Sequence, residues 1–369
     1  MAGSGQNAVR MSIEWARIEP SPGEFSTTEL DHYREVIGTA RDLGLTTSVT
    51  LHHFTNPVWF AKGGGWDSSE SAETFARYVR AASGALGDLF QYVNTINEPS
   101  VLAVVGHIMG FFPPRVNDVV AAHRVTVNLL KAHAAAVAAL RGTTGAKVGV
   151  PLSVLDFYPT EDTPMAWKAR DFMHWSWVGV WLDALGTGNV RGLSVPDETI
   201  PGLAGADDFV GIQYYSRFDV HPAALDAAGS AADVVPNPIG SRSTLPRKAD
   251  ERRTQMGWLW FPEGLGNVID EVADRTGLPI QITENGIATA DDDERIEFVT
   301  KHLEQVHDAI DRGKNVRGYF YWSTLDNFEW NDGYRPTFGL IGVDRSTMER
   351  TPKPSLAWYG GIARANALG

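Results

Sequence analysis

The sequence contains no cysteine among its 369 residues, which excludes disulfide bonds and any metal site built from thiolates. Basic residues are also few for its size: 32 Lys and Arg stand against 45 Asp and Glu, a formal net charge of −13. Nucleic acid and anionic membranes repel a protein of this charge, so neither is expected as a partner. We expect instead a soluble protein that binds an uncharged small molecule.

Long apolar runs are also scarce. No N-terminal apolar segment resembles a signal peptide. The longest apolar helix candidate, residues 119–140, is interrupted by His123, Arg124, Lys131 and His133, which argues against a membrane span. A cytoplasmic location is therefore the expectation from the sequence.

What the sequence does contain is an alternation of strand-like and helix-like segments. Apolar periodicity and stop signals predict helices at 28–43, 69–86, 119–140, 167–185, 262–276 and 292–312. Short apolar runs predict seven strands at 8–13, 46–51, 92–96, 147–151, 208–213, 278–284 and 316–321. Such alternation predicts an α/β fold with a parallel sheet. No linker divides the chain, so one domain over residues 1–369 is expected, with a loop-like stretch at 219–256.

Two of the predicted strands lead into a glutamate. Glu284 ends the run before Asn285-Gly286, and Glu98 follows the strand at 92–96. The carboxyl ends of barrel strands carry the chemistry, so these two side chains can face each other across a pocket. Glycoside hydrolysis needs such a pair, one carboxyl as acid and the other as nucleophile or base. The structural alternatives are a helix cap for Glu98 and a salt-bridged loop residue for Glu284.

Five short motifs follow one another along the chain: RMSIEW at 10–15, HHFTNP at 52–57, TINEP at 95–99, ITENG at 282–286 and WSTLDNFEW at 322–330. With these motifs the chain resembles glycoside hydrolase family 1, the β-glucosidase family, over residues 8–366. The resemblance implies a TIM-type (β/α) barrel as a single catalytic domain. It also implies a retaining β-glycosidase without a cofactor, which acts on β-glucosides and to some extent on β-galactosides or β-fucosides.

The resemblance assigns the chemistry to particular residues. Glu98 would be the general acid and then the general base, and Glu284 the nucleophile of a glycosyl-enzyme intermediate. A nearby carboxylate would raise the pKa of Glu98, as an acid requires. Arg10 and Tyr215 would keep Glu284 ionised, although a structural ion pair and ordinary core packing are their alternatives. In a retaining pair the two carboxyl groups are expected to lie about 5–5.5 Å apart.

Five further residues would hold the sugar. By the resemblance, Asn97 hydrogen-bonds the 2-hydroxyl and His53 another hydroxyl of the same ring. Glu329 would bind hydroxyls at the far end of the sugar, between walls formed by Trp322 and Trp330. A turn role for Asn97 and core packing for the two tryptophans are the alternatives.

The sequence departs from the family pattern in two places. The family's first strand, which carries a sugar-binding Gln, is absent, so the barrel is expected to be incomplete. The gap would lie between the strands at 8–13 and 316–321. It would be narrowed, covered by the N-terminal residues or buried in a homo-oligomer contact. Gln213 stands where the family usually has Asn, and a structural and a functional role are equally open for it.

Three expectations concern the ligand and the activity. Residues 331–336 lack the Ser and Lys with which family members bind 6-phosphorylated sugars, so an unphosphorylated substrate is expected. The pair His52-His53 has no third ligand at a fitting spacing, so no metal is expected. The absent first strand leaves one rival interpretation, a weakly active or inactive sugar-binding remnant of the same fold.

Overall fold

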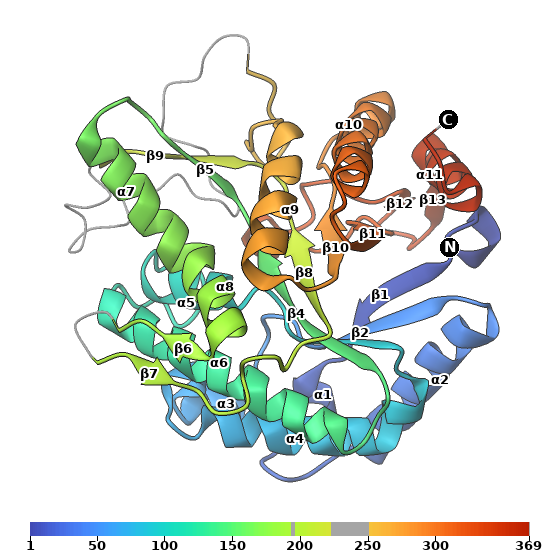
Figure 1. Ribbon diagram of the computed structural model, residues 1–369. Coiled ribbons are helices and arrows are strands. Elements are labelled where there is room, and N and C mark those ends of the chain that lie inside the picture. The colour runs from blue at the N-terminus through green and yellow to red at the C-terminus, as the bar shows by residue number, and fades with distance from the viewer. Residues whose placement is uncertain (193–195, 223–250, 369) are drawn as a thin grey trace.

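The computed structural model describes residues 1–192, 196–222 and 251–368, and a seven-stranded parallel sheet curved into a barrel forms its centre (Figure 1). The strands lie in the order β1-β2-β3-β4-β8-β10-β11, and all neighbouring strands are parallel. Each strand predicted from the sequence is found, so the seven-stranded, TIM-type architecture is confirmed. The strands are β1 (Ala8–Ser12), β2 (Thr46–His52), β3 (Tyr92–Ile96), β4 (Lys147–Ser153), β8 (Phe209–Gln213), β10 (Ile280–Asn285) and β11 (Val316–Tyr321).

Helices surround the sheet, and polar side chains fix where several of them begin (Figure 1). Ser26, Asp118 and Asp291 accept hydrogen bonds from the first free backbone N–H groups of α2, α6 and α10. No helix of the described ranges is long and apolar enough to cross a membrane. The helices are α1 (Trp15–Ile18), α2 (Thr27–Asp42), α3 (Val58–Lys62), α4 (Ser71–Leu86), α5 (Pro99–His107), α6 (Val119–Arg141), α7 (Pro164–His174), α8 (Val180–Thr187), α9 (Glu263–Thr276), α10 (Asp292–Asp311) and α11 (Pro354–Ala365).

Two segments differ from the sequence prediction. The helical stretch at 167–185 is two helices, α7 and α8, joined by a π-helical turn at Trp175–Gly179. Within the expected loop at 219–256, residues 223–250 lie outside the described ranges. Residues 219 and 220, however, belong to strand β9 (Arg217–Val220), which pairs with β5 (Asp156–Pro159). The loop prediction is wrong there, because a four-residue strand that depends on a distant partner leaves no pattern of its own in the sequence.

The barrel has an open seam between β1 and β11. Within the described ranges, each of these strands pairs on one side only, with β2 and β10 respectively, although the curvature of the sheet brings them within 8 Å of each other (Figure 1). The N-terminal turn at Ala2–Ser4 packs on α11, where the Arg364 guanidinium donates to the Ser4 carbonyl oxygen at 2.6 Å. The seam is therefore narrowed by the approach of the two strands and partly covered by the N-terminal residues.

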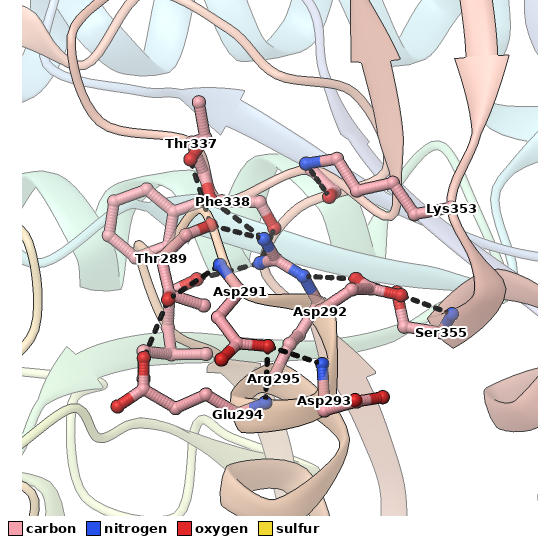
Figure 2. A network of polar contacts seen from close by, with 12 residues as sticks. Thr289, Asp291, Asp292, Asp293, Glu294, Arg295, Thr337, Phe338, Lys353 and Ser355 are labelled. Carbon is pink, nitrogen blue, oxygen red and sulfur yellow. Dashed lines mark hydrogen bonds and ion pairs between the residues drawn. The ribbon is translucent and has the colours of Figure 1, made fainter.

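A buried arginine joins the loops that follow the last two strands of the sheet. The Arg295 side chain on α10 is 1% exposed, and its three nitrogens all donate hydrogen bonds (Figure 2). Two of its contacts are with side chains: Asp292 Oδ1 at 2.9 Å and the Tyr321 hydroxyl at 2.8 Å. The others are with four backbone carbonyl oxygens outside α10, at 2.7–3.1 Å. They belong to Ile287, Thr289, Thr337 and Phe338. This network ties the loop after β10 to the segment at 337–338.

Replacing Arg295 by Met should destabilise the protein by about 3–5 kcal/mol, because Asp292 and four carbonyl groups would lose their charged donor inside the protein. Urea-induced unfolding of the two proteins measures this difference. Arg312→Met is the matched control. Arg312 is 47% exposed and pairs with Asp270, so its loss should cost at most about 1 kcal/mol. Equal losses in the two variants would contradict a structural role for the Arg295 network.

Candidate active site

The two glutamates singled out in the sequence lie at the carboxyl ends of two strands of the barrel. Glu284 is the last residue but one of strand β10. Glu98 follows β3 and precedes Pro99 at the start of α5. Backbone hydrogen bonds fix the second position: the Asn97 N–H donates to the His52 carbonyl at 2.8 Å, and the Glu98 N–H to the Pro151 carbonyl at 3.0 Å. The ends of β2 and β4 thus hold Glu98 in place from both sides.

Glu284 is buried and surrounded by donors. Arg10 Nη1 lies 2.5 Å from its Oε1, Gln213 Nε2 donates to the same oxygen at 2.9 Å, and the Tyr215 hydroxyl donates to Oε2 at 2.7 Å. Three donors, one of them cationic, are therefore directed at the two carboxyl oxygens of Glu284 in a buried site. Gln213 and Arg10 also donate to Asn97 Oδ1, which links the amide beside Glu98 to the same cluster.

Glu98 has the opposite electrostatic environment. Burial, followed by the negative charge of Glu284, raises the pKa of Glu98 well above its usual value of 4.5. Arg10 and a hydrogen bond with Ser153 oppose this rise only in part. One carboxyl group is thus favoured in its neutral form beside another that is surrounded by donors, as an acid and a nucleophile require.

Aromatic rings and a third carboxyl group lie beside this pair. The His53 ring contacts the rings of both Trp322 and Trp330, at centroid distances of 6.0 and 5.8 Å. Burial lowers the pKa of His53 well below 6.5, so its ring is neutral. Burial and then the charge of Glu284 raise the pKa of Glu329 to about 8, against a hydrogen bond from Trp322. All ten residues predicted for the site therefore belong to one connected cluster, although its roles in catalysis and binding stay predictions.

Several buried polar atoms of the cluster have no hydrogen-bond partner among the described residues. They are Asn97 Nδ2, Gln213 Oε1, Glu329 Oε2 and Arg10 Nε. A buried polar atom without a partner is costly, and a ligand rich in hydroxyl groups can satisfy donors and acceptors alike. The chemistry of the first three atoms therefore suits a sugar.

Sequence reasoning missed two residues that support the site. Ser153, which bonds Glu98, ends β4, and the strand was predicted to stop two residues earlier. Asn285 donates to the Tyr214 carbonyl at 2.6 Å and accepts from the Tyr319 hydroxyl at 2.5 Å, so it anchors the end of β10. Extending the 147–151 strand to the next polar residue would have found Ser153, whereas the contacts of Asn285 have no signal in the sequence.

A parallel barrel with two buried carboxyl groups in opposed environments at its carboxyl end provides the pair that glycoside hydrolases use. The chain belongs to glycosyl hydrolase family 1, whose family model matches residues 1–368.

Relatives and solved structures agree with this assignment. The chain is 34% identical to "Beta-glucosidase A" of Thermotoga maritima, over 99% of this chain and 84% of the relative. It is 31% identical to a "6-phospho-beta-galactosidase" of Staphylococcus haemolyticus, over 99% of this chain and 86% of the relative. Its fold is similar to that of a solved "beta-glycosidase from Pyrococcus horikoshii", with a TM-score of 0.89, 37% identity and coverage of 100% of this chain and 83% of the other.

The pKa of Glu329 predicts how stability depends on pH. Below about pH 4.5 the carboxyl is protonated in both the folded and the unfolded chain, and its stabilising effect is fully present. As the pH rises toward 8, the unfolded carboxyl ionises while the buried one retains its proton, so stability falls. Compared with Glu329→Gln, the native protein should lose up to about 4–5 kcal/mol over this range, at about 1.36 kcal/mol per pKa unit.

Urea unfolding of both proteins at several pH values measures this difference. Glu98 titrates in both, so its contribution largely cancels in the comparison. Parallel stability curves for the native protein and Glu329→Gln would show that the pKa of Glu329 is not raised.

Proposed function

We propose that the protein is a retaining β-glycosidase that hydrolyses unphosphorylated β-glucosides by double displacement, without a cofactor or metal. The observation that carries the proposal is the contrast between the two carboxyl groups. Glu284 has three donors, and Glu98 has a raised pKa beside it. The β-glucosidase relative supports a glucoside as substrate.

In the first step, Glu284 attacks the anomeric carbon while the bond to the leaving oxygen breaks and Glu98 gives that oxygen its proton. In the second step, water attacks the anomeric carbon of the glycosyl-enzyme, Glu98 takes a proton from the water, and the bond to Glu284 breaks so that Glu284 leaves as a carboxylate. Arg10, Gln213 and Tyr215 stabilise Glu284 before the first step and after the second. Asn97 would bind the 2-hydroxyl, where a contact strengthens in the transition state.

The far end of the sugar site supports an unphosphorylated substrate. Glu329 lies there with Trp322 and Trp330, and the charge of Asp332 adds to the rise in the pKa of Glu329. The nearby cation of Arg335 is paired with Asp332 and also donates to the Gln255 carbonyl at 2.8 Å. Among the described residues, a 6-phosphate would meet carboxyl groups here but no cation that is not already paired. Activity on β-galactosides and β-fucosides, which differ from glucosides in one or two hydroxyl groups, is part of the same proposal.

The open seam favours one rival, a weakly active or inactive sugar-binding remnant of the fold. Hydrolysis of a chromogenic β-glucoside separates the two, because a remnant would bind without turnover. The cytoplasmic location and the homo-oligomer contact at the seam stay predictions.

The mechanism predicts that the product keeps the anomeric configuration of the substrate. Proton NMR of the first sugar released from a β-glucoside should therefore show the β-anomer. Release of the α-anomer would contradict the mechanism, and so would a carboxyl separation of about 6.5 Å or more between Glu98 and Glu284 in a sugar complex.

The two carboxyl groups should also respond differently to substitution. Glu284→Ala should lose nearly all turnover on every substrate. Glu98→Ala should lose about 10²–10⁴-fold on alkyl glucosides but keep most of the glycosylation rate on dinitrophenyl glucosides, whose leaving group needs no proton. Steady-state and pre-steady-state rates of both variants measure this, with circular dichroism to verify folding. Equal losses of Glu98→Ala on both substrates would contradict its role as the acid.

The preference for an unphosphorylated substrate can be tested by comparing a glucoside with its 6-phosphate. At a pH above about 8, where Glu329 is ionised, the kcat/KM for a nitrophenyl β-glucoside should exceed that for its 6-phosphate by at least about tenfold, because a phosphate would face the Glu329 carboxylate in a poorly solvated site. At that pH, Glu329→Gln should narrow the ratio between the two substrates. A native protein that prefers the 6-phosphate would overturn this part of the proposal.

A further inference from the structure

The open seam forms a groove along the outer edges of β1 and β11. Its volume is about 560 Å³, and its walls come from both strands and from α10 and α11. Most of the side chains that line it are apolar or aromatic, among them Leu303 and Ile310 of α10, Tyr319 of β11, and Tyr359 and Ile362 of α11. The groove therefore combines an apolar cleft with two strand edges.

Burial of the strands shows that the packing around the sheet is interrupted at this groove. β8 and β10 are buried along their whole lengths. β11 has no fully buried residue, and only one residue of β1 is fully buried. Strands of parallel sheets are normally buried on both faces. The two edge strands thus leave accessible both the backbone groups and the side chains that the inner strands hide.

Two buried donors that line the groove have no acceptor. Nε2 of Gln6 and Nε of Arg10 lack a hydrogen-bond partner within the described part of the chain. Gln6 is 9% exposed, and the Arg10 side chain is 6% exposed. A purely apolar ligand would leave both donors unsatisfied, whereas a polypeptide backbone supplies carbonyl acceptors.

We propose that this groove binds one extended, apolar polypeptide segment, which joins the sheet as an eighth parallel strand between β1 and β11. Backbone groups on both sides of the segment would pair with the two free edges. Its side chains would pack toward α10 and α11 on one face and toward the barrel interior on the other. A closed ring of strands leaves no edge, so the segment would remove both edges at once.

A second copy of this chain fits the groove poorly. Every strand in the described ranges is already paired in the barrel or in a two-stranded sheet, so a copy has no free strand to insert. α10 and α11 flank the groove, which leaves room for a single extended chain rather than for the edge of a folded barrel. β1 and β11 come within 8 Å of each other, but strands on either side of an inserted one lie about 9.6 Å apart. Binding therefore widens the seam.

The probe is a capped synthetic peptide with five consecutive valines and isoleucines between pairs of lysines, which keep it soluble. Titration calorimetry measures its binding to the full chain, and the shift in Tm measures stabilisation by the bound peptide. Neither readout requires turnover, so failure of this proposal is distinguishable from failure of the glycosidase proposal. We expect saturable one-to-one binding and a Tm that rises with peptide concentration.

Two matched controls separate strand addition from apolar adsorption. The first is the same peptide N-methylated at alternate residues, which keeps its apolar character but cannot donate along one edge; it should bind at least tenfold more weakly. The second is a pair of protein variants at residues that are both 47% exposed. Ile310→Asp in the groove wall should weaken binding at least tenfold, whereas Val120→Asp on α6, away from the groove, should not change it.

Several outcomes would overturn the proposal. These are the absence of binding at millimolar peptide, equal binding of the N-methylated peptide, or equal effects of the two aspartate variants. Light scattering tests the other occupant: a native dimer that Ile310→Asp dissociates and Val120→Asp does not would show that a second copy covers the groove instead.

Discussion

The site depends on one constraint, which is that a carboxylate removed from water must find donors in the protein. Glu284 finds them on elements far apart in the sequence: Arg10 on β1, and Gln213 and Tyr215 at the end of β8. Only a sheet curved into a barrel brings these strand ends to one carboxylate. Burial, followed by the negative charge of Glu284, raises the pKa of Glu98. The fold thus gives the two carboxyl groups different environments.

Arg10 also links this site to the seam, because the same guanidinium donates to Glu284 and lines the groove beside β11. Its Nη1 and Nη2 are engaged with Glu284 and Asn97, whereas its Nε has no partner in the described ranges. A strand placed in the groove would therefore contact a residue that donates to Glu284. One side chain thus joins the edge of the sheet to the buried carboxyl pair.

Much of the fold and of the candidate site could be predicted from the sequence. The inner strands of a parallel barrel are continuous apolar runs, and the candidate functional residues follow at their carboxyl ends. That logic located Glu98 and Glu284, and the motif resemblance added the other eight residues of the cluster. Gln213, for which two roles were open, serves Glu284 and Asn97 at the same time. The side chain of Gln213 is longer than that of the Asn which the family usually has at this position. Its amide nitrogen donates to both Glu284 Oε1 and Asn97 Oδ1.

Other features of the structure leave no recognisable pattern in the neighbouring sequence. Arg295 is one polar residue within an amphipathic helix, and only the folded chain shows that it binds carbonyl groups from two separate segments. The pairing of β5 with β9 and the packing of the N-terminal turn on α11 likewise depend on partners distant in sequence. Short elements stabilised by tertiary contacts cannot be recognised from periodicity, since three or four residues are too few to establish a repeating pattern.

The backbone at Glu98 has a consequence for how the protein evolves. Its φ of 41° lies in the left-handed region, which glycine adopts without strain and a side chain with a Cβ does not. A buried carboxyl group at such a position lowers stability in two ways, through backbone strain and through loss of hydration. Selection for stability alone would replace this glutamate with glycine. Glutamate at residue 98 is therefore held at a cost in stability, and thermostability screens without an activity test would tend to discard it.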